Sequence, residues 1–579
     1  MTPANQATLP AKGAAHDSPR AAHTLDVMIL IVLGLVVGLS LKGLALKPHG
    51  DFYGLWETGD ALLHGELPAS FKRAPVYPLL VAALGSILRA AGLGEVPPQR
   101  AAEWINALLL PVNAVLVYWL AQHGAGGIAR WVAWWFVLLP IGMYCTTNAL
   151  VEPLLVTTLL LTLVAAQRRS GWAYVWAAAA TMTRYDAAGA IVGLVVADRL
   201  HNRSWRGAVW RAGAAGTPLM IWLALTACTW HTRAGDHYLV EIAERPSFHP
   251  AYPFLVTHQA VFDAERLRLP AVLQDSEPLF RYGIHGVLVV LVLVGVGVGL
   301  RAHRPAVLCG ATTFAGYALV HAVFPFQFDR FGYPLAPLYL SVAGLGLGAV
   351  APHLRVPRTL QRASHVLLLA VAGVLVFVLW SELEGFGFLT SRKYAWVAPL
   401  PGAVLLATGA LWGLSGPARA AALPRLATLL ALAVIGLAHL RTATPRVTPL
   451  TEMNGVVEAA RWVRDHVGAG ERVLSGVPGL LRLYAGRQPT GRFLGFDEIA
   501  ADTWPQIIAE CRERRIGYVL WYDELFGELG NYYVHQCRLE RFAGLSAPEQ
   551  LTDVAIAGRL PGPPNVLILQ VLPPTGGDP

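Results

Sequence analysis

Apolar runs of helical length, separated by short polar segments, dominate the chain from residue 25 to residue 440. A helix needs about 20 apolar residues to span a bilayer, and LDVMILIVLGLVVGLSLKGLAL at 25–46 is the first run to reach that length. The later runs are 101–121, 131–147, 150–166, 172–184, 186–198, 208–231, 283–300, 306–324, 333–351, 364–381, 395–414 and 424–440. Together they predict an α-helical polytopic membrane protein with about thirteen transmembrane helices.

Basic residues between the runs predict which loops face the cytoplasm. Lys12 and Arg20 place the N-terminal tail, 1–24, inside, because positive charge marks the cytoplasmic ends of membrane helices. The loops 47–100 and 232–281 then lie outside, within a transmembrane domain that we expect to cover 25–440. This pattern predicts a multi-pass protein of the inner (plasma) membrane.

The run 75–93 leaves two placements open. It is apolar but short, and two prolines lie near its start, so it either spans the bilayer or lies along the interface. The interfacial placement puts Arg168 and Arg169 inside and Glu152 outside, whereas a span reverses both. We therefore favour the interfacial placement.

Beyond residue 440 the pattern changes to that of a soluble domain. EAARWVRDHVGAGERVLSGV is typical of an amphipathic helix, a glycine turn and a short strand. TWPQIIAECRERRIGYVLWYDE repeats the helix and the strand, and NVLILQVLP offers a closing strand. We expect a small α/β domain over 446–579, and the helix count places it on the outer, periplasmic or extracellular, side.

Composition supports a bilayer as the main solvent. Hydrophobic residues make up 55% of the 579 residues and charged residues 14%, against about a half and a quarter in soluble domains. The formal net charge is +8, which in a soluble protein suggests nucleic acid as a partner. Here the arginines are expected in cytoplasmic loops, so the partners indicated are membrane lipids and not nucleic acid.

The stretch 50–80, GDFYGLWETGDALLHGELPASFKRAPVYPLL, combines the residue types of a transfer site beside the membrane. Asp51 could act as a general base on an acceptor hydroxyl, while Lys72 and Arg73 hold a phosphate leaving group. The alternative is structural, with Asp51 capping a helix that starts near Phe52.

These residues resemble a known family. Asp51, then ALLHG ending at Gly65, then RAPVYPLL is similar to the first outer loop of the superfamily C (GT-C fold) glycosyltransferases. Protein O-mannosyltransferases and the lipid A aminoarabinose transferase belong to this superfamily. The resemblance implies a polyprenyl-phosphate-linked sugar as donor, about thirteen spans and an outer tail.

The resemblance also implies roles for two acids. Asp51 matches the catalytic base of the family, and Glu152 matches the position of its second acid, usually Asp. Phe52 follows Asp51 where a further acid is often found. Two alternatives therefore stay open. Asp51 and Glu152 could bind a divalent metal, the one cofactor considered, or Glu152 could only interact with the dipole of its helix.

Three arginines are candidates for the donor phosphate. Arg73 precedes the proline pair, Arg184 lies where two short helices meet, and Arg330 opens RFGYPLAPLYL, which resembles the family's Arg-x-x-Tyr-x-x-Pro segment. A structural pair with Asp186 is the alternative for Arg184, and one with Asp329 for Arg330. Further candidates for substrate contacts are Tyr53, Glu57, Tyr77, Asp186 and Tyr333.

The prediction is an inverting hexosyl- or pentosyltransferase. It would move the sugar from the lipid donor to a glycan, lipid or protein acceptor on the outer face. The rivals are a transporter or flippase of lipid-linked substrates, and an assembly protein that kept the fold without activity. Transporters concentrate charge near the midplane of repeated halves, whereas these candidates gather at one rim, which disfavours transport.

Overall fold

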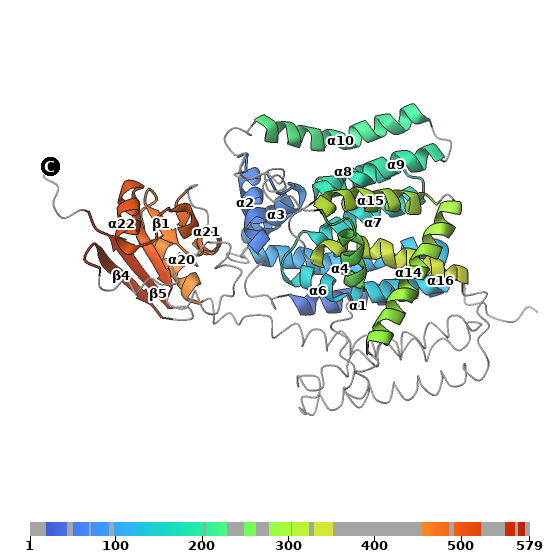
Figure 1. Ribbon diagram of the computed structural model, residues 1–579, viewed down its shortest axis with the longest axis horizontal. Helices are drawn as coiled ribbons and strands as arrows, with labels where there is room; N and C mark the ends of the chain where they lie inside the picture. Colours follow the sequence, from blue (N-terminus) through green and yellow to red (C-terminus); the bar gives the residue numbers. More distant parts are fainter. Residues whose placement is uncertain are drawn as a thin grey trace, which may run out of the picture.

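The computed structural model describes thirteen stretches of the chain: 19–42, 50–68, 71–91, 98–200, 204–228, 248–261, 277–302, 304–323, 329–350, 454–485, 491–522, 551–561 and 565–573. They form a bundle of long helices and a smaller domain built on a sheet (Figure 1). The predicted spans 364–381, 395–414 and 424–440 lie outside these residues.

The helices of the bundle follow the apolar runs closely. In chain order they are α1 (Pro19–Leu41), α2 (Gly50–Leu63), α3 (Val76–Ala90), α4 (Pro98–Ala125), η1 (Gly126–Ile128), α5 (Ala129–Val137), α6 (Pro140–Thr147), α7 (Glu152–Gln167), α8 (Trp172–Thr181), η2 (Tyr185–Ala188), α9 (Gly189–Leu200), α10 (Trp205–Cys228), α13 (Tyr252–Val261), α14 (Glu277–Arg301), α15 (Pro305–Val323), η6 (Asp329–Leu335) and α16 (Ala336–Val350).

Within the described stretches, four helical segments are long and apolar enough to cross a membrane, namely Pro98–His123, Trp205–Cys228, Pro305–Val323 and Arg330–Val350. A fifth span results if the bent pair α5 and α6 counts as one. The prediction of a polytopic helical membrane protein is confirmed.

The helices differ from the predicted spans in two details. The run 131–147 is not one straight helix, because α5 and α6 meet at 48° where Pro140 opens α6 and cannot continue the preceding hydrogen-bond ladder. The first helix begins at Pro19, inside the segment expected as a tail, and ends at Leu41.

Helix α3 is too short for an ordinary span. Its 15 residues reach about 22 Å at 1.5 Å per residue, against about 30 Å of hydrocarbon. It packs beside α2 and α4 at the end of the bundle nearest the smaller domain (Figure 1). This length agrees with an interfacial position, which stays a prediction.

Glycines allow the closest crossings in the bundle. A Cβ at Gly295 in α14 would overlap the carbonyl oxygen of Val342 in α16, and one at Gly193 in α9 would overlap the Thr312 hydroxyl in α15. Small residues at such crossings let helix backbones approach, which replaces the missing hydrophobic driving force within a membrane.

The C-terminal domain contains α20 (Asn454–His466), β1 (Arg472–Ser475), α21 (Pro478–Ala485), β2 (Phe493–Gly495), α22 (Trp504–Glu513), β3 (Ile516–Tyr522), β4 (Val554–Leu560) and β5 (Val566–Val571). The sheet order is β2-β1-β3-β5-β4. β1 runs parallel to β2 and β3, whereas β5 is antiparallel to β3 and β4. The helix-to-strand repeat and the closing strand read from the sequence are present.

We predict that Gly295→Ala lowers the stability of the bundle by about 1–3 kcal/mol, because the new methyl group meets backbone in α16. Gly297→Ala in the same helix is the matched control, since nothing lies within 4 Å of a Cβ there. Thermal unfolding in detergent measures both variants. Equal melting temperatures for the two would contradict the crossing.

Candidate functional site

Asp51 lies in the first turn of α2, where its carboxylate is bound by two arginines. Arg73 donates from Nη2 to Asp51 Oδ1 at 2.5 Å, and Arg330 donates from Nη2 to Asp51 Oδ2. Arg73 follows α2 in the chain, whereas Arg330 is the second residue of η6 and lies 279 residues after Asp51. Both carboxylate oxygens are therefore held by guanidinium groups, and a mere helix-capping role for Asp51 is not what the structure shows.

Glu152 opens α7 and is fully buried, with 0% of its surface exposed. Arg184 Nη1 lies 3.2 Å from Glu152 Oε1, and Arg330 Nε lies 3.9 Å from the same oxygen. Glu152 Oε2 has no hydrogen-bond partner among the described residues. A carboxylate this deep is tolerable only because cations and the helix N-terminus face it.

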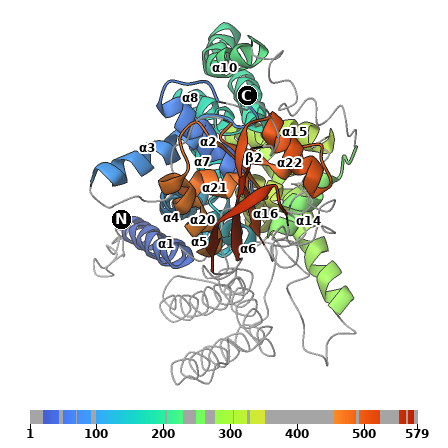
Figure 2. The ribbon, with the colours of Figure 1, turned by 90° about the vertical axis from the view of Figure 1, so that its left-hand side faces the viewer.

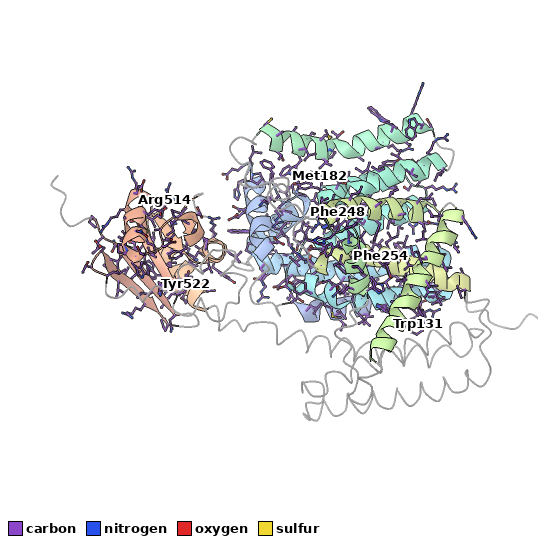
Figure 3. All side chains as sticks on the ribbon, viewed as in Figure 1. Trp131, Met182, Phe248, Phe254, Arg514 and Tyr522 are labelled. Carbon is purple, nitrogen blue, oxygen red and sulfur yellow. The ribbon has the colours of Figure 1, made fainter. Side chains whose placement is uncertain are left out.

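Arg184 joins this acid to a second one. Its backbone is extended between α8 and η2, and its guanidinium donates to Asp186 from Nε at 3.1 Å and from Nη2 at 2.8 Å. Met182, labelled in Figure 3, marks the end of α8 two residues earlier, and its carbonyl accepts the Val76 amide at the start of α3 at 3.1 Å. The structural pair of Arg184 and Asp186 is thus formed.

His321, near the end of α15, extends the cluster and was not expected from the sequence. Its Nε2 lies 3.0 Å from Asp186 Oδ2, and the imidazole stacks on Tyr317 at 4.1 Å between ring centroids. The only local sign of a role for His321 was its position, as a polar side chain near the end of an apolar helix. Nothing in the spacing links it to Asp186, 135 residues earlier.

Phe331 covers two of the arginines. The guanidinium carbons of Arg184 and Arg330 lie 5.2 Å and 5.3 Å from the centroid of its ring, within the range of cation–π attraction. The Tyr317 hydroxyl donates to the Phe331 carbonyl at 2.8 Å and so fixes this turn to α15. We call the seven residues Asp51, Arg73, Glu152, Arg184, Asp186, His321 and Arg330 the charged cluster.

The charged cluster lies at one end of the bundle. Glu152 begins α7, and Arg168 and Arg169 follow its other end, about 24 Å away for 16 residues. Asp186 likewise precedes α9, whose last turn carries Arg199. Candidate residues and basic loops are therefore at opposite ends of the same helices.

The other predicted residues are placed less centrally. Lys72 precedes Arg73 and is half-buried. Tyr77 and Tyr333 are fully buried; Tyr77 donates to the Ala149 carbonyl at 3.1 Å, and Tyr333 stacks on Phe136. Such positions favour packing over substrate contact. The side chains of Tyr53 and Asp329 lie outside the described residues, and Glu57 is paired with an arginine of the C-terminal domain.

A divalent metal fits this arrangement poorly. Both oxygens of Asp51 are occupied by guanidinium groups, and Glu152 faces Arg184 and Arg330. No group of three His, Cys, Asp or Glu side chains that could hold a metal occurs among the residues described. We derive no step through a metal.

No protein-family model and no curated protein matches the sequence. Solved structures do match the fold. ArnT from Cupriavidus metallidurans, a lipid A aminoarabinose transferase, superposes in its apo state with a TM-score of 0.54 and 13% identity, over 95% of this chain and 98% of that one. The chain shares the GT-C fold of ArnT.

A second ArnT structure, bound to undecaprenyl phosphate, matches with a TM-score of 0.52 and 13% identity over the same shares. The archaeal oligosaccharyltransferase AglB from Archaeoglobus fulgidus follows with a TM-score of 0.44 and 12% identity, covering 88% of this chain and 70% of that one. The superfamily C fold predicted from the outer-loop motif is confirmed, and the ArnT match extends over the tail as well as the bundle.

We predict that Arg184→Met destabilises the protein by about 3–5 kcal/mol, because it leaves Glu152 and Asp186 buried without their shared cation. Adding Asp186→Asn should restore part of the loss. Thermal unfolding in detergent measures both. The control is Arg461→Met, which removes an exposed ion pair with Glu458 on α20 and should leave the melting temperature unchanged. A fully stable Arg184→Met variant would contradict the linking role.

Proposed function

We propose that this protein is a membrane glycosyltransferase that moves a sugar from a polyprenyl-phosphate-linked donor to an acceptor hydroxyl on the outer face of the membrane. The observation that carries the proposal is the binding of Asp51 by Arg73 and Arg330, directly beside the pair of Glu152 and Arg184. A carboxylate that can serve as a base thus lies among cations suited to bind a phosphate.

The fold supports a lipid-linked donor. ArnT, whose fold this chain shares, has been crystallised with undecaprenyl phosphate. A donor on such a carrier would move through the bilayer to the end of the bundle. The charged cluster lies at that end. The partners proposed are therefore the lipid donor, the surrounding membrane lipids and a glycan, lipid or protein acceptor.

The chemistry places negative charge on the carrier phosphate. The acceptor oxygen forms a bond to the anomeric carbon from the face opposite the phosphate, its proton passes to Asp51, and the bond from carbon to phosphate oxygen breaks with inversion. The leaving phosphate keeps the electron pair and gains one negative charge. Arg73, Arg184 and Arg330 stabilise that charge more in the transition state than in the bound donor.

Donor binding would also release the base. Asp51 held by two guanidinium groups is a weak base, because proton transfer to it would break two charge-assisted hydrogen bonds. A donor phosphate competes for the same arginines. The carboxylate then becomes available as a base only when the donor is in place.

The outer segment 232–281 would cover the site when substrates are bound. Helix α13 of this segment packs against η6, and the His249 amide donates to the Ala322 carbonyl at 2.7 Å next to His321. The cover would therefore act on the elements that carry Arg330 and His321.

We predict that Asp51→Asn lowers the turnover of sugar transfer about 10²–10⁴-fold, because the amide cannot accept the proton. The variant keeps the size of the side chain, so lipid-donor binding should persist. Asp60→Asn in the same helix is the matched control and should transfer normally. Transfer of radiolabelled sugar from a synthetic polyprenyl-phosphate donor measures all three proteins, and undiminished turnover by Asp51→Asn would favour a non-catalytic assembly protein.

We predict that Arg330→Ala weakens binding of the lipid donor about 10–150-fold, the value of one hydrogen bond between charged groups. Arg211→Ala is the control, because Arg211 pairs with Asp198 near the other end of α9 and should bind the donor normally. Equilibrium binding of a fluorescent polyprenyl phosphate measures the affinities. An unchanged affinity of Arg330→Ala would remove this arginine from the phosphate site.

A further inference from the structure

Helix α21 of the C-terminal domain contacts α2, the helix that carries Asp51. Arg482 Nη1 donates to Glu57 Oε1 at 2.5 Å, and Nη2 of the same guanidinium donates to the Phe493 carbonyl at 2.7 Å. One arginine therefore joins α2 to the sheet edge at β2, across 425 residues of sequence. Figure 1 shows α21 on the side of its domain that faces α2, and Figure 2 views the molecule from the end at which the C-terminal domain lies.

The same helix contributes apolar side chains to the bundle. Leu483 is 5% exposed and belongs to a buried cluster with Phe52, Leu55 and Leu154, and Tyr484 packs against that cluster. These are core contacts, not surface ones. Since the ion pair of Arg482 and Glu57 is about one-third exposed on each side, most of the docking energy must come from Leu483 and Tyr484.

Two members of this buried cluster are neighbours in sequence of Asp51 and Glu152. Phe52 follows Asp51 directly, and Leu154 lies two residues after Glu152 at the start of α7. Helix α2 has 14 residues, a length at which isolated helices are marginal in water, so its position depends on what packs against it. Helix α3 packs against it, and α21 also contacts it.

We infer that α21 is a positioning element for the site: by docking on α2 through Leu483, Tyr484 and Arg482, the C-terminal domain holds Asp51 in register with Arg330 and Glu152. The effect on catalysis rests on the proposed function. The docking of α21 on α2 does not depend on it. It gives the domain a role distinct from acceptor binding. Arg482 and Leu483 act through α2 and touch no reacting atom.

The test uses Arg482→Glu, which sets two carboxylates side by side, and the double variant Glu57→Arg with Arg482→Glu, which restores opposite charges. Leu483→Ala removes the apolar contact. Arg461→Glu on α20 is the matched control, a charge reversal of an exposed ion pair in the same domain. All are made in the full-length chain.

Two measurements are made on each protein. The first is kcat and donor KM for sugar transfer; we expect Arg482→Glu and Leu483→Ala to lower kcat about tenfold with donor KM within about twofold, since a small misplacement of a base is costly. The charge swap should recover kcat to within about threefold of wild type. The second is hydrogen exchange, which should rise in α2 and stay unchanged in β3.

The outcomes separate this inference from the proposed function. Arg482→Glu and Leu483→Ala with wild-type kcat would overturn the positioning role, as would a lowered kcat that the charge swap does not recover. If the wild-type protein transfers no sugar, the proposed function fails on its own. Exchange in α2 then decides the docking, and unchanged exchange in both variants would overturn it.

Discussion

The arrangement at the end of the bundle depends on one constraint, the cost of burying charge where water cannot reach it. Three carboxylates, those of Asp51, Glu152 and Asp186, face three guanidinium groups, and each acid is within 4 Å of at least one arginine. Removing an ion from water costs several kcal/mol, so the acids and arginines must come together or not be buried at all. The helix ends, the turn at η6 and the break at Arg184 all bring these groups into contact.

Because its acids and arginines are paired with each other, the charged cluster can rearrange when a further charged group binds. In the proposed reaction a bound phosphate would add negative charge, and the arginines would bind it by weakening their ion pairs with an acid. Asp51 is the acid best placed for that exchange, because its 24% exposed side chain is the least buried of the three. Glu152 and Asp186 are nearly enclosed and act as fixed counter-charges for Arg184 and Arg330.

Local patterns predicted the elements, and the positive-inside rule predicted which charges would share an end. Asp51, Glu152, Arg184 and Arg330 could be grouped before any coordinates because each interrupts or borders an apolar run. His321 could not, since its partner Asp186 is 135 residues away and no period connects them. The pair of Glu57 and Arg482 could not be predicted from the sequence for the same reason. The bend between α5 and α6 was indicated only by Pro140, and the direction of such a bend depends on packing.

The separation of these partners along the chain has a consequence for biogenesis. Arg330 follows Asp51 by 279 residues and Arg482 follows Glu57 by 425, so at about 5–20 residues per second α2 leaves the ribosome well before either arginine exists. The pair of Asp51 and Arg330 can form only after η6 has been synthesised, and the pair of Glu57 and Arg482 only after the C-terminal domain has been synthesised. A chain cut short after α16 would carry every acid and arginine of the cluster and still lack the helix that docks on α2. Completion of synthesis is thereby built into the assembly of the site.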